Sequence, residues 1–155
     1  MGGGHILFVC TGNICRSPMA EALLRHALPP GSEWSCSSAG LMPVPGQSAS
    51  RHAVKALAEV GVPLSGHTAR AVTAAILDRS DMILVMSEDH RDLLLRRYPT
   101  LQDRIYLLRS FAPPELKDDP DIPDPFGGSL AVYRRCRDLI RACIPGLLHF
   151  LQTLD

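Results

Sequence analysis

Short apolar runs alternate along the chain with segments in which apolar residues recur at helical spacing. The apolar runs are typical of buried strands, and they lie at residues 5–9, 34–39, 81–86 and 105–108. The periodic segments predict helices at residues 19–28, 50–60, 73–79, 87–97 and 129–154. Strands that alternate with helices form right-handed crossovers and a parallel sheet. The pattern therefore predicts an α/β fold, a Rossmann-like three-layer sandwich around a central four-stranded parallel sheet.

Polar and helix-breaking residues mark where several of these helices begin and end. Thr73 and Ser87 are expected to cap their helices, and Ser48 or Ser50 is expected to cap the helix at 50–60. Pro145-Gly146 is expected to break or kink the last helix, because proline removes a backbone donor. The stretch 112–128 holds five prolines and five acidic residues, which predicts a long loop or lid.

Length and composition limit the classes of protein to which the chain can belong. At 155 residues, with 46% hydrophobic and 21% charged residues, it is expected to form one domain, residues 1–155. The 16 basic and 16 acidic residues balance, which disfavours nucleic acid or an anionic membrane as a partner. No apolar run approaches the roughly 18 residues of a membrane span, and no secretory signal opens the chain. Five cysteines, an odd number, disfavour a secreted disulfide framework. We expect a cytoplasmic protein and a monomer.

The residues between the first strand and the first helix carry the candidate chemistry. This loop begins with Cys10 and reaches Arg16 and Ser17 after five intervening residues. Backbone N–H groups at a helix N-terminus and the helix dipole together form a site for oxyanions. Arg16 adds a planar fork for two phosphate oxygens, and the positive field favours a thiolate at Cys10. Gly12 is expected to supply backbone angles that other residues resist, and Ser17 to hydrogen bond the Cys10 sulfur.

The loop resembles the phosphate-binding loop of the low-molecular-weight protein tyrosine phosphatases over its full string, Cys10-Thr11-Gly12-Asn13-Ile14-Cys15-Arg16-Ser17-Pro18. The resemblance implies the phosphotyrosine phosphatase I-like fold. It also implies a hydrolase that acts on phosphorylated proteins or peptides through a phosphocysteine intermediate, binds phosphate-like oxyanions, and uses no metal or other cofactor. Cys10 would then be the nucleophile and Arg16 the phosphate ligand, and the residues that bind phosphate or support the loop would be Thr11, Gly12, Asn13, Ile14, Cys15 and Ser17.

Two further segments resemble parts of the family that support this loop. Ser37-Ser38-Ala39-Gly40 resembles a segment whose serine joins the hydrogen-bond network of the loop, and Ser38 is the matching residue; the alternative is a serine in an ordinary turn. Gly66-His67-Thr68-Ala69-Arg70 resembles a segment whose histidine bonds the loop asparagine. His67 is therefore expected to orient Asn13 and to transfer no proton, and the other five histidines lie in no motif. Leu41 begins a loop at the rim of the site, where it is expected to form a wall for the substrate.

Displacing phosphate from an ester requires an acid that protonates the leaving oxygen. Four aspartates lie in the stretch 112–128, and only Asp124 is followed by Pro125-Phe126, which resembles the family's Asp-Pro acid and its aromatic neighbour. Asp124 is expected to act first as the acid and then, as a carboxylate, as the base for the water that hydrolyses phosphocysteine. Phe126 is expected to form one wall of an aryl slot, whereas Asp118 and Asp119 are expected to be solvated.

Two features of the sequence indicate different substrates. The run from Asp124 to Ser129, followed by Tyr133, resembles a bacterial branch of the family that includes protein-arginine phosphatases. Those enzymes carry threonine where this chain has Ile14, and isoleucine adds bulk and removes a hydroxyl. Gly127 departs from the aryl-phosphate branch, which usually has a second aromatic residue there. We expect phosphotyrosine as the substrate, with phosphoarginine as the alternative.

Two other classes of function are weighed against this interpretation. Thiol-dependent arsenate reductases share the fold and the loop, but the places of their two relay cysteines read Met86 and Leu93 here. A non-catalytic phosphoprotein-binding module would tolerate loss of Cys10 or Asp124, and both are present. Both classes are therefore distant alternatives.

The remaining cysteines have structural and redox interpretations. Cys15 is close enough in sequence to trap oxidised Cys10 as a reversible disulfide, and the equally weighted alternative is that it packs beneath the loop. Cys136 and Cys143 lie seven residues apart on one helix, where they are expected to pack in the core.

Overall fold

A parallel sheet of four strands forms the centre of the molecule. The computed structural model describes residues 3–154, so residues 1, 2 and 155 of the expected domain lie outside the described part. The strands are β1 (Gly4–Cys10), β2 (Trp34–Gly40), β3 (Met82–Val85) and β4 (Ile105–Leu107). They are ordered β2-β1-β3-β4, and every neighbouring pair is parallel. The predicted parallel sheet is confirmed.

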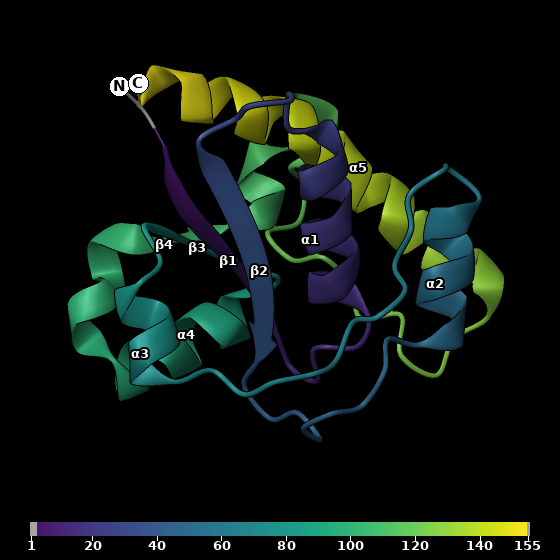
Figure 1. The fold of residues 1–155 in the computed structure, drawn as a ribbon, viewed down its shortest axis with the longest axis horizontal. Coiled ribbons are helices and arrows are strands. Elements are labelled where there is room, and N and C mark those ends of the chain that lie inside the picture. The colour runs from purple at the N-terminus through teal and green to yellow at the C-terminus, as the bar shows by residue number, and fades with distance from the viewer. Residues whose placement is uncertain (1–2, 155) are drawn as a thin grey trace.

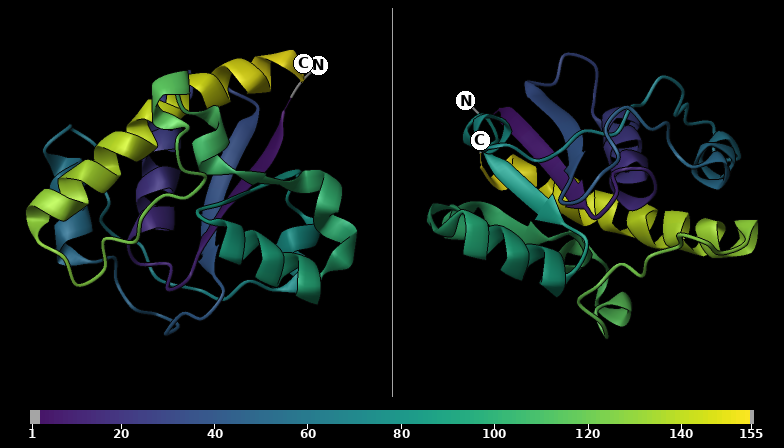
Figure 2. Two further views of the ribbon diagram at one scale, coloured as in Figure 1. Left: turned by 180° about the vertical axis from the view of Figure 1, so that it is seen from behind. Right: turned by 90° about the horizontal axis from the view of Figure 1, so that it is seen from below.

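Helices cover both faces of this sheet, as Figures 1 and 2 show. Side chains of β1 alternate between the faces, so Ile6 and Phe8 belong to one hydrophobic cluster and Leu7 and Val9 to the other. The first cluster also contains side chains of α1 (Arg16–Ala27), α2 (Arg51–Ala58) and α5 (Leu130–Thr153). The second contains side chains of α3 (Ala74–Asp78) and α4 (Glu88–Arg97). This arrangement is the predicted three-layer sandwich.

The carboxyl ends of the four strands lie at one edge, toward which the β2 arrow points in Figure 1. The segments that follow the strands therefore gather there, including the loop 10–15 after β1 and the loop 41–50 after β2. After β4 the chain continues through the 3-10 helices Leu108–Phe111 and Pro114–Leu116, and a third such helix, Pro99–Arg104, precedes β4. Ligands of open parallel sheets bind at this edge. The fold thus places the candidate loop where such a sheet binds its ligands.

The predicted cap residues stand at the starts of three helices, and two of them make the capping hydrogen bond. Thr73 accepts a hydrogen bond from the Ile76 N–H at the start of α3, and Ser87 accepts one from the His90 N–H at the start of α4. Ser50 occupies the N-cap position of α2, but its hydroxyl donates to the Tyr133 hydroxyl at 3.0 Å. Ser50 therefore holds the predicted N-cap position, but its side chain bonds a residue of α5 and makes no capping bond.

The last helix runs without interruption through Pro145, so the predicted break is wrong. Gly146 follows it on the side where the helix meets the chain after β4, and a Cβ atom there would collide with the Phe111 carbonyl oxygen. The Pro-Gly pair thus marks a close approach of two segments.

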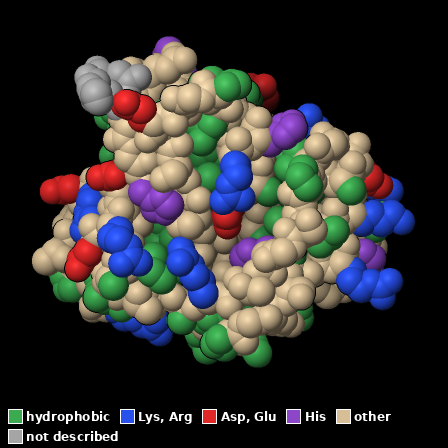
Figure 3. Space-filling view, viewed as in Figure 1, with side chains coloured by type: hydrophobic (Ala, Val, Ile, Leu, Met, Phe, Trp, Pro, Cys, Tyr) green, Lys and Arg blue, Asp and Glu red, His purple; other side chains and the backbone are tan. Residues whose placement is uncertain are grey.

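No helix within residues 3–154 is long and apolar enough to cross a membrane. Basic and acidic side chains are interspersed over the face shown in Figure 3.

Candidate active site

The loop from Cys10 to Cys15 joins the end of β1 to the start of α1. Cys10 is the last residue of β1 and is 3% exposed. Cys15 is the N-cap residue of α1, and its side chain makes no capping hydrogen bond. The first amides of α1 are thus left to bind an anion at the loop. Strand β2 ends beside this loop, where the N–H groups of Leu41 and Met42 donate to the carbonyls of Cys10 and Thr11 at 3.0 and 2.9 Å.

The unusual backbone angle of the loop falls on Asn13. Its φ of 57° is the one positive value of a residue other than glycine within residues 3–154, and Gly12 has no positive φ. The expectation for Gly12 is therefore wrong, because asparagine also tolerates the left-handed region. A different glycine is required nearby, since a Cβ on Gly40 would lie 2.7 Å from the Thr11 carbonyl oxygen. Gly40 lets the end of β2 approach the loop closely.

Hydrogen bonds of the fully buried Asn13 side chain hold the loop in this shape. Its amide nitrogen donates to the Ser17 and Ser38 hydroxyls, both at 2.9 Å, and its amide oxygen accepts from the Arg70 N–H at 3.0 Å. The Nε2 atom of His67 lies 2.7 Å from the Asn13 backbone oxygen. The structure thus brings Ser38 and His67 to Asn13, as the sequence leads one to expect.

The same hydrogen bonds continue to the Cys10 sulfur. The Ser17 hydroxyl lies 2.9 Å from Cys10 Sγ, and neither side chain is accessible beyond a few per cent. At the other end, Ser38 donates to the Glu21 carboxylate at 2.6 Å. A hydrogen-bonded series of Glu21, Ser38, Asn13 and Ser17 therefore links α1 and β2 to the candidate nucleophile, which restricts its position.

Arg16 connects the phosphate loop with the segment that carries Asp124. Its side chain is buried, and one terminal nitrogen donates to the Ile122 carbonyl at 2.9 Å. The other terminal nitrogen lies 3.6 Å from Asp124 Oδ2. The Asp124 carboxyl is 52% exposed, and its Oδ1 atom accepts a hydrogen bond from the Phe126 N–H at 3.1 Å. The candidate acid is therefore next to the candidate phosphate ligand.

The other acidic residues of the segment have structural contacts instead. The Asp121 carboxylate accepts from the Glu88 N–H at the start of α4, and the Asp119 carboxylate accepts from the Asp121 N–H. Asp118 is exposed, as expected, but it also forms an ion pair with the buried Arg109 at 3.0 Å. None of these three lines the cleft around Cys10, whereas Asp124 does.

A cleft of about 320 Å³ opens over the loop, and its lining residues are Cys10, Thr11, Gly12, Ile14, Cys15, Arg16, Met42, Val44, Gln47, Asp124 and Phe126. Phe126 stands at the predicted wall and is 69% exposed. Leu41 does not line this cleft: it is buried and packs in the second hydrophobic cluster. Leu41 instead lines an adjoining pocket beside Thr11, Arg16 and Asp124, whereas Met42 and Val44 line the cleft itself, so the part of Leu41 as a substrate wall stays a prediction.

The structure adds His90 and Tyr133 to the candidate site. The Nε2 atom of His90 lies 2.9 Å from the Thr11 hydroxyl, and burial followed by the charge of Arg16 lowers the pKa of His90 to about 4. The Tyr133 hydroxyl lies 3.2 Å from Cys15 Sγ, and burial raises the pKa of Tyr133 to about 12. Burial likewise raises the pKa of the Cys15 thiol. Both have a sequence signal: Ser87 starts the helix of His90 directly after a strand, and Tyr133 follows the run from Asp124 to Ser129 that resembles the arginine-phosphatase branch.

The five cysteines are free and buried, which agrees with the core positions expected for Cys136 and Cys143. Within residues 3–154 no three histidine, cysteine or acidic side chains converge as a metal ligand set would. A buried sulfur beside a helix N-terminus and a guanidinium, with a carboxyl group across an open cleft, can accept a phosphoryl group and protonate the group that leaves.

Comparisons with known proteins agree with this chemistry. Residues 5–155 match the family model of the low molecular weight phosphotyrosine protein phosphatases. A protein-arginine-phosphatase of Geobacillus stearothermophilus is 40% identical over 149 residues, which are 96% of this chain and 97% of that protein. The structure of the Erwinia amylovora tyrosine phosphatase amsI superposes with a TM-score of 0.86 at 34% identity, covering 97% of this chain and 93% of that one.

A second similar structure bears on the oxyanion site. Vibrio vulnificus Wzb, in complex with benzylphosphonate, superposes with a TM-score of 0.84 at 29% identity and covers 99% of this chain and 100% of that one. The match of almost the whole chain to the family model, together with these relatives, identifies the class of protein. The chain belongs to the low molecular weight phosphotyrosine protein phosphatase family, whose members are hydrolases of phosphorylated proteins.

Proposed function

We propose that the protein hydrolyses phosphotyrosine in protein or peptide substrates in two steps. The Cys10 thiolate attacks phosphorus, the bond from phosphorus to the tyrosine oxygen breaks, and Asp124 gives its proton to the departing phenolate. Asp124, now a carboxylate, takes a proton from water as that water attacks the phosphocysteine. Inorganic phosphate leaves and the Cys10 thiolate is restored.

The contacts of the loop support these roles. Arg16 is fixed by its bond to the Ile122 carbonyl and lines the cleft above the loop, where its other N–H groups can bind phosphate oxygens. Together with the amides at the start of α1, they stabilise the charge that develops on the equatorial oxygens. Ser17, at 2.9 Å from Cys10 Sγ, stabilises the thiolate when it attacks and when it leaves. Positive groups of the chain thus fill the role that a metal ion has in other phosphatases.

The observation that carries the choice of phosphotyrosine is the apolar rim of the cleft. Met42, Val44 and Phe126 are 70%, 67% and 69% exposed, and they are three of the four large hydrophobic residues exposed within residues 3–154. All three line the cleft, together with the side chain of Ile14. Exposed apolar side chains gathered around a phosphate site favour an aryl ring as the group that carries the phosphate.

Phosphoarginine is the second candidate, and the 40% identical arginine phosphatase is the observation that favours it. A guanidinium is polar on every edge and needs hydrogen-bond acceptors when it loses water. Ile14 offers none at the place where the resemblance puts threonine in arginine phosphatases. We therefore place phosphoarginine second.

The substrate is tested by offering phosphotyrosine and phosphoarginine peptides of one sequence to the parent protein and to Ile14→Thr. We expect the parent to show at least a tenfold higher kcat/KM for phosphotyrosine. Ile14→Thr should narrow that ratio, because it removes bulk and restores a hydroxyl. A parent protein that prefers phosphoarginine would reverse the choice, and an unchanged ratio in Ile14→Thr would show that Ile14 does not set it.

The proposal extends to the setting in which the protein works. We place it in the cytoplasm, because a nucleophilic thiol stays active only in a reducing compartment. We also propose that residues 1–155 act as one domain and as a monomer, without cofactor. Light scattering of the purified protein at assay concentration tests the monomer, and a mass of two chains would contradict it.

A further inference from the structure

The carboxyl group of Asp124 has few contacts of its own. It is half exposed, it accepts one hydrogen bond from the Phe126 N–H, and it lies 3.6 Å from a nitrogen of Arg16. A proton donor acts efficiently only when it is held close to the right geometry. The position of Asp124 therefore depends on what holds the backbone of its segment, residues 112–128, called here the acid segment.

Arg109 bonds the acid segment at three places. It lies in the 3-10 helix after β4, and it is one of the few charged residues that are buried, at 8% exposure. Its Nε atom donates to the Leu116 carbonyl at 2.8 Å, and Nη1 donates to the Asp121 carbonyl at 2.6 Å. Nη2 donates to the Asp118 carboxylate at 3.0 Å. One guanidinium thus draws together two carbonyls and one carboxylate within six residues of chain.

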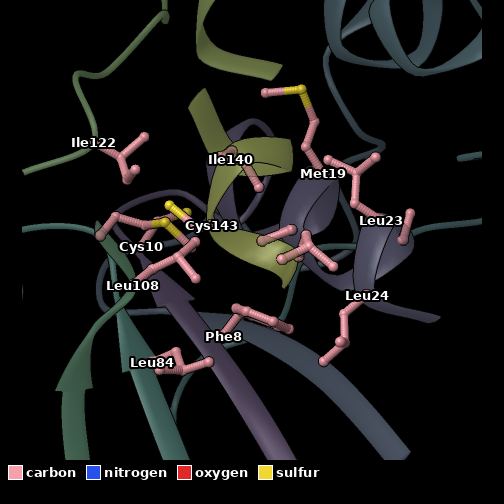
Figure 4. Close-up of a cluster of buried hydrophobic side chains, with 14 of the residues drawn as sticks. Phe8, Cys10, Met19, Leu23, Leu24, Leu84, Leu108, Ile122, Ile140 and Cys143 are labelled. Carbon is pink, nitrogen blue, oxygen red and sulfur yellow. The ribbon is translucent and has the colours of Figure 1, made fainter. Parts of the chain in front are cut away.

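The residue after Asp121, Ile122, is held by contacts of its own. The Ile122 N–H donates to the Met86 carbonyl at 2.8 Å, and the Ile122 carbonyl accepts from Arg16. The Ile122 side chain is fully buried in the cluster that also contains Leu108 and Cys10, as Figure 4 shows. Asp124 follows two residues later. Arg109 therefore holds residues 116–121, which lead directly to the anchored residue Ile122 and then to Asp124.

We propose that Arg109 is a positioning residue for the general acid, an inference that rests on the role proposed above for Asp124. Through Leu116, Asp118 and Asp121, Arg109 holds the acid segment so that Asp124 stays over the cleft. It makes none of its described hydrogen bonds to the phosphate loop. Its loss should consequently weaken proton donation to the leaving group and leave phosphate binding by the loop intact.

Lysine is the sharpest substitution for this test because it keeps the positive charge. An ammonium group on a single flexible stem cannot reach three acceptors in the directions of a planar fork. Arg109→Lys should therefore loosen the acid segment with no change in net charge. Arg104→Lys is the matched control, since Arg104 is half-buried and donates to the carbonyls of Leu77 and Ser80 at 3.2 and 2.8 Å, outside the acid segment.

The measurement compares kcat/KM for phenyl phosphate, whose leaving group needs a proton, with kcat/KM for p-nitrophenyl phosphate, whose leaving group needs it far less. Arg109→Lys should lower the first about tenfold or more and the second less than threefold, within the range of general acid catalysis. Arg104→Lys should affect both alike. The inhibition constant of inorganic phosphate should stay within about twofold in every variant.

Combination with Asp124→Ala separates the possible outcomes. If Asp124→Ala lowers kcat/KM of both esters equally, the acid role in the proposed function fails. If Asp124→Ala favours the better leaving group and Arg109→Lys does not, only the inference about Arg109 fails. We expect Arg109→Lys to add no leaving-group effect to Asp124→Ala, because both act on the same proton transfer. Additive losses would also overturn the inference.

Asp118→Ala tests the same inference if Arg109→Lys does not fold, which a melting curve of Arg109→Lys would show. Asp118 is exposed at the surface, so Asp118→Ala removes one of the three contacts of Arg109 without disturbing the core. We expect the same preference for the better leaving group, at about twofold to threefold. An Asp118→Ala protein with an unchanged ratio would then count against the positioning role.

Discussion

His90 is a buried histidine whose two ring nitrogens have different surroundings. Nε2 lies 2.9 Å from the Thr11 hydroxyl, whereas Nδ1 is buried and has no hydrogen-bond partner within residues 3–154. Burial and the positive charge of Arg16 lower the pKa of His90 to about 4, although Asp124, Asp121 and Asp89 act in the opposite direction. The folded protein thus keeps this ring neutral where an exposed histidine, with a pKa of about 6.5, would become charged.

This difference predicts how stability depends on pH. Between pH of about 6.5 and 4 the unfolded chain binds a proton at position 90 and the folded chain does not, so stability falls as pH falls. We expect His90 to contribute about 2 kcal/mol to that loss. Urea denaturation of the parent and of His90→Asn at pH 7 and pH 4.5 measures it. The variant should lose less stability between the two pH values, and equal losses would contradict the assignment.

At the scale of elements, α5 and the 3-10 helix Leu108–Phe111 approach each other at Gly146. A glycine inside a helix ordinarily costs about 1 kcal/mol relative to alanine. Here a Cβ atom would collide with the Phe111 carbonyl, which belongs to backbone and cannot rotate away. Replacing Gly146 by alanine should therefore destabilise the protein, whereas the same change within a helix ordinarily stabilises it.

Gly146→Ala tests this close approach. We expect it to lower the free energy of unfolding by about 1–3 kcal/mol, as overpacking does. Pro145→Ala is the control at the preceding, exposed position, and it should not destabilise the helix because it restores a backbone N–H. Thermal or urea denaturation of both variants decides the matter. A Gly146→Ala protein more stable than the parent would mean that the two elements are not in contact as described.

At the scale of the whole molecule, the site is assembled where all four parallel strands end. The phosphate loop follows β1, Met42 and Val44 follow β2, and His90 lies in the helix after β3. Asp124 and Phe126 lie in the segment after β4. Each contribution comes from a different part of the chain; Thr11 and His90, for example, are hydrogen bonded although they lie 79 residues apart in the sequence. The sheet gives these segments a common edge.

This assembly explains what the sequence predicts and what it does not. Cys10, Arg16 and Ser17 are predictable because their function depends on residues within one continuous loop. The strands and most helix bounds are predictable because short apolar runs and amphipathic spacing are properties of neighbouring residues in the sequence. The N-cap position of Ser50 is predictable, but its hydrogen bond to Tyr133 is not, because that partner lies 83 residues away. The turn after β2, which puts Met42 and Val44 rather than Leu41 in the cleft, is likewise not visible in the local pattern.

The role of Arg109 has no local signature. A buried arginine with three acceptors in a later segment looks, in sequence, like any arginine after a short strand. Its partners lie 7, 9 and 12 residues further along the chain, and only the tertiary structure shows that they converge on it. A positioning residue is in this respect harder to predict than the nucleophile or the acid.

The most direct test of the central claim is to find the phosphoryl group during turnover. Asp124→Asn lacks the base that would activate water, so a phosphorylated intermediate should accumulate when this variant is mixed with p-nitrophenyl phosphate, whose leaving group needs the missing acid far less, and quenched. Mass spectrometry of the proteolysed protein should place the phosphoryl group on Cys10, and Cys10→Ser should neither turn over nor form the cysteine adduct. A phosphoryl group on another residue, or turnover by Cys10→Ser, would contradict the account.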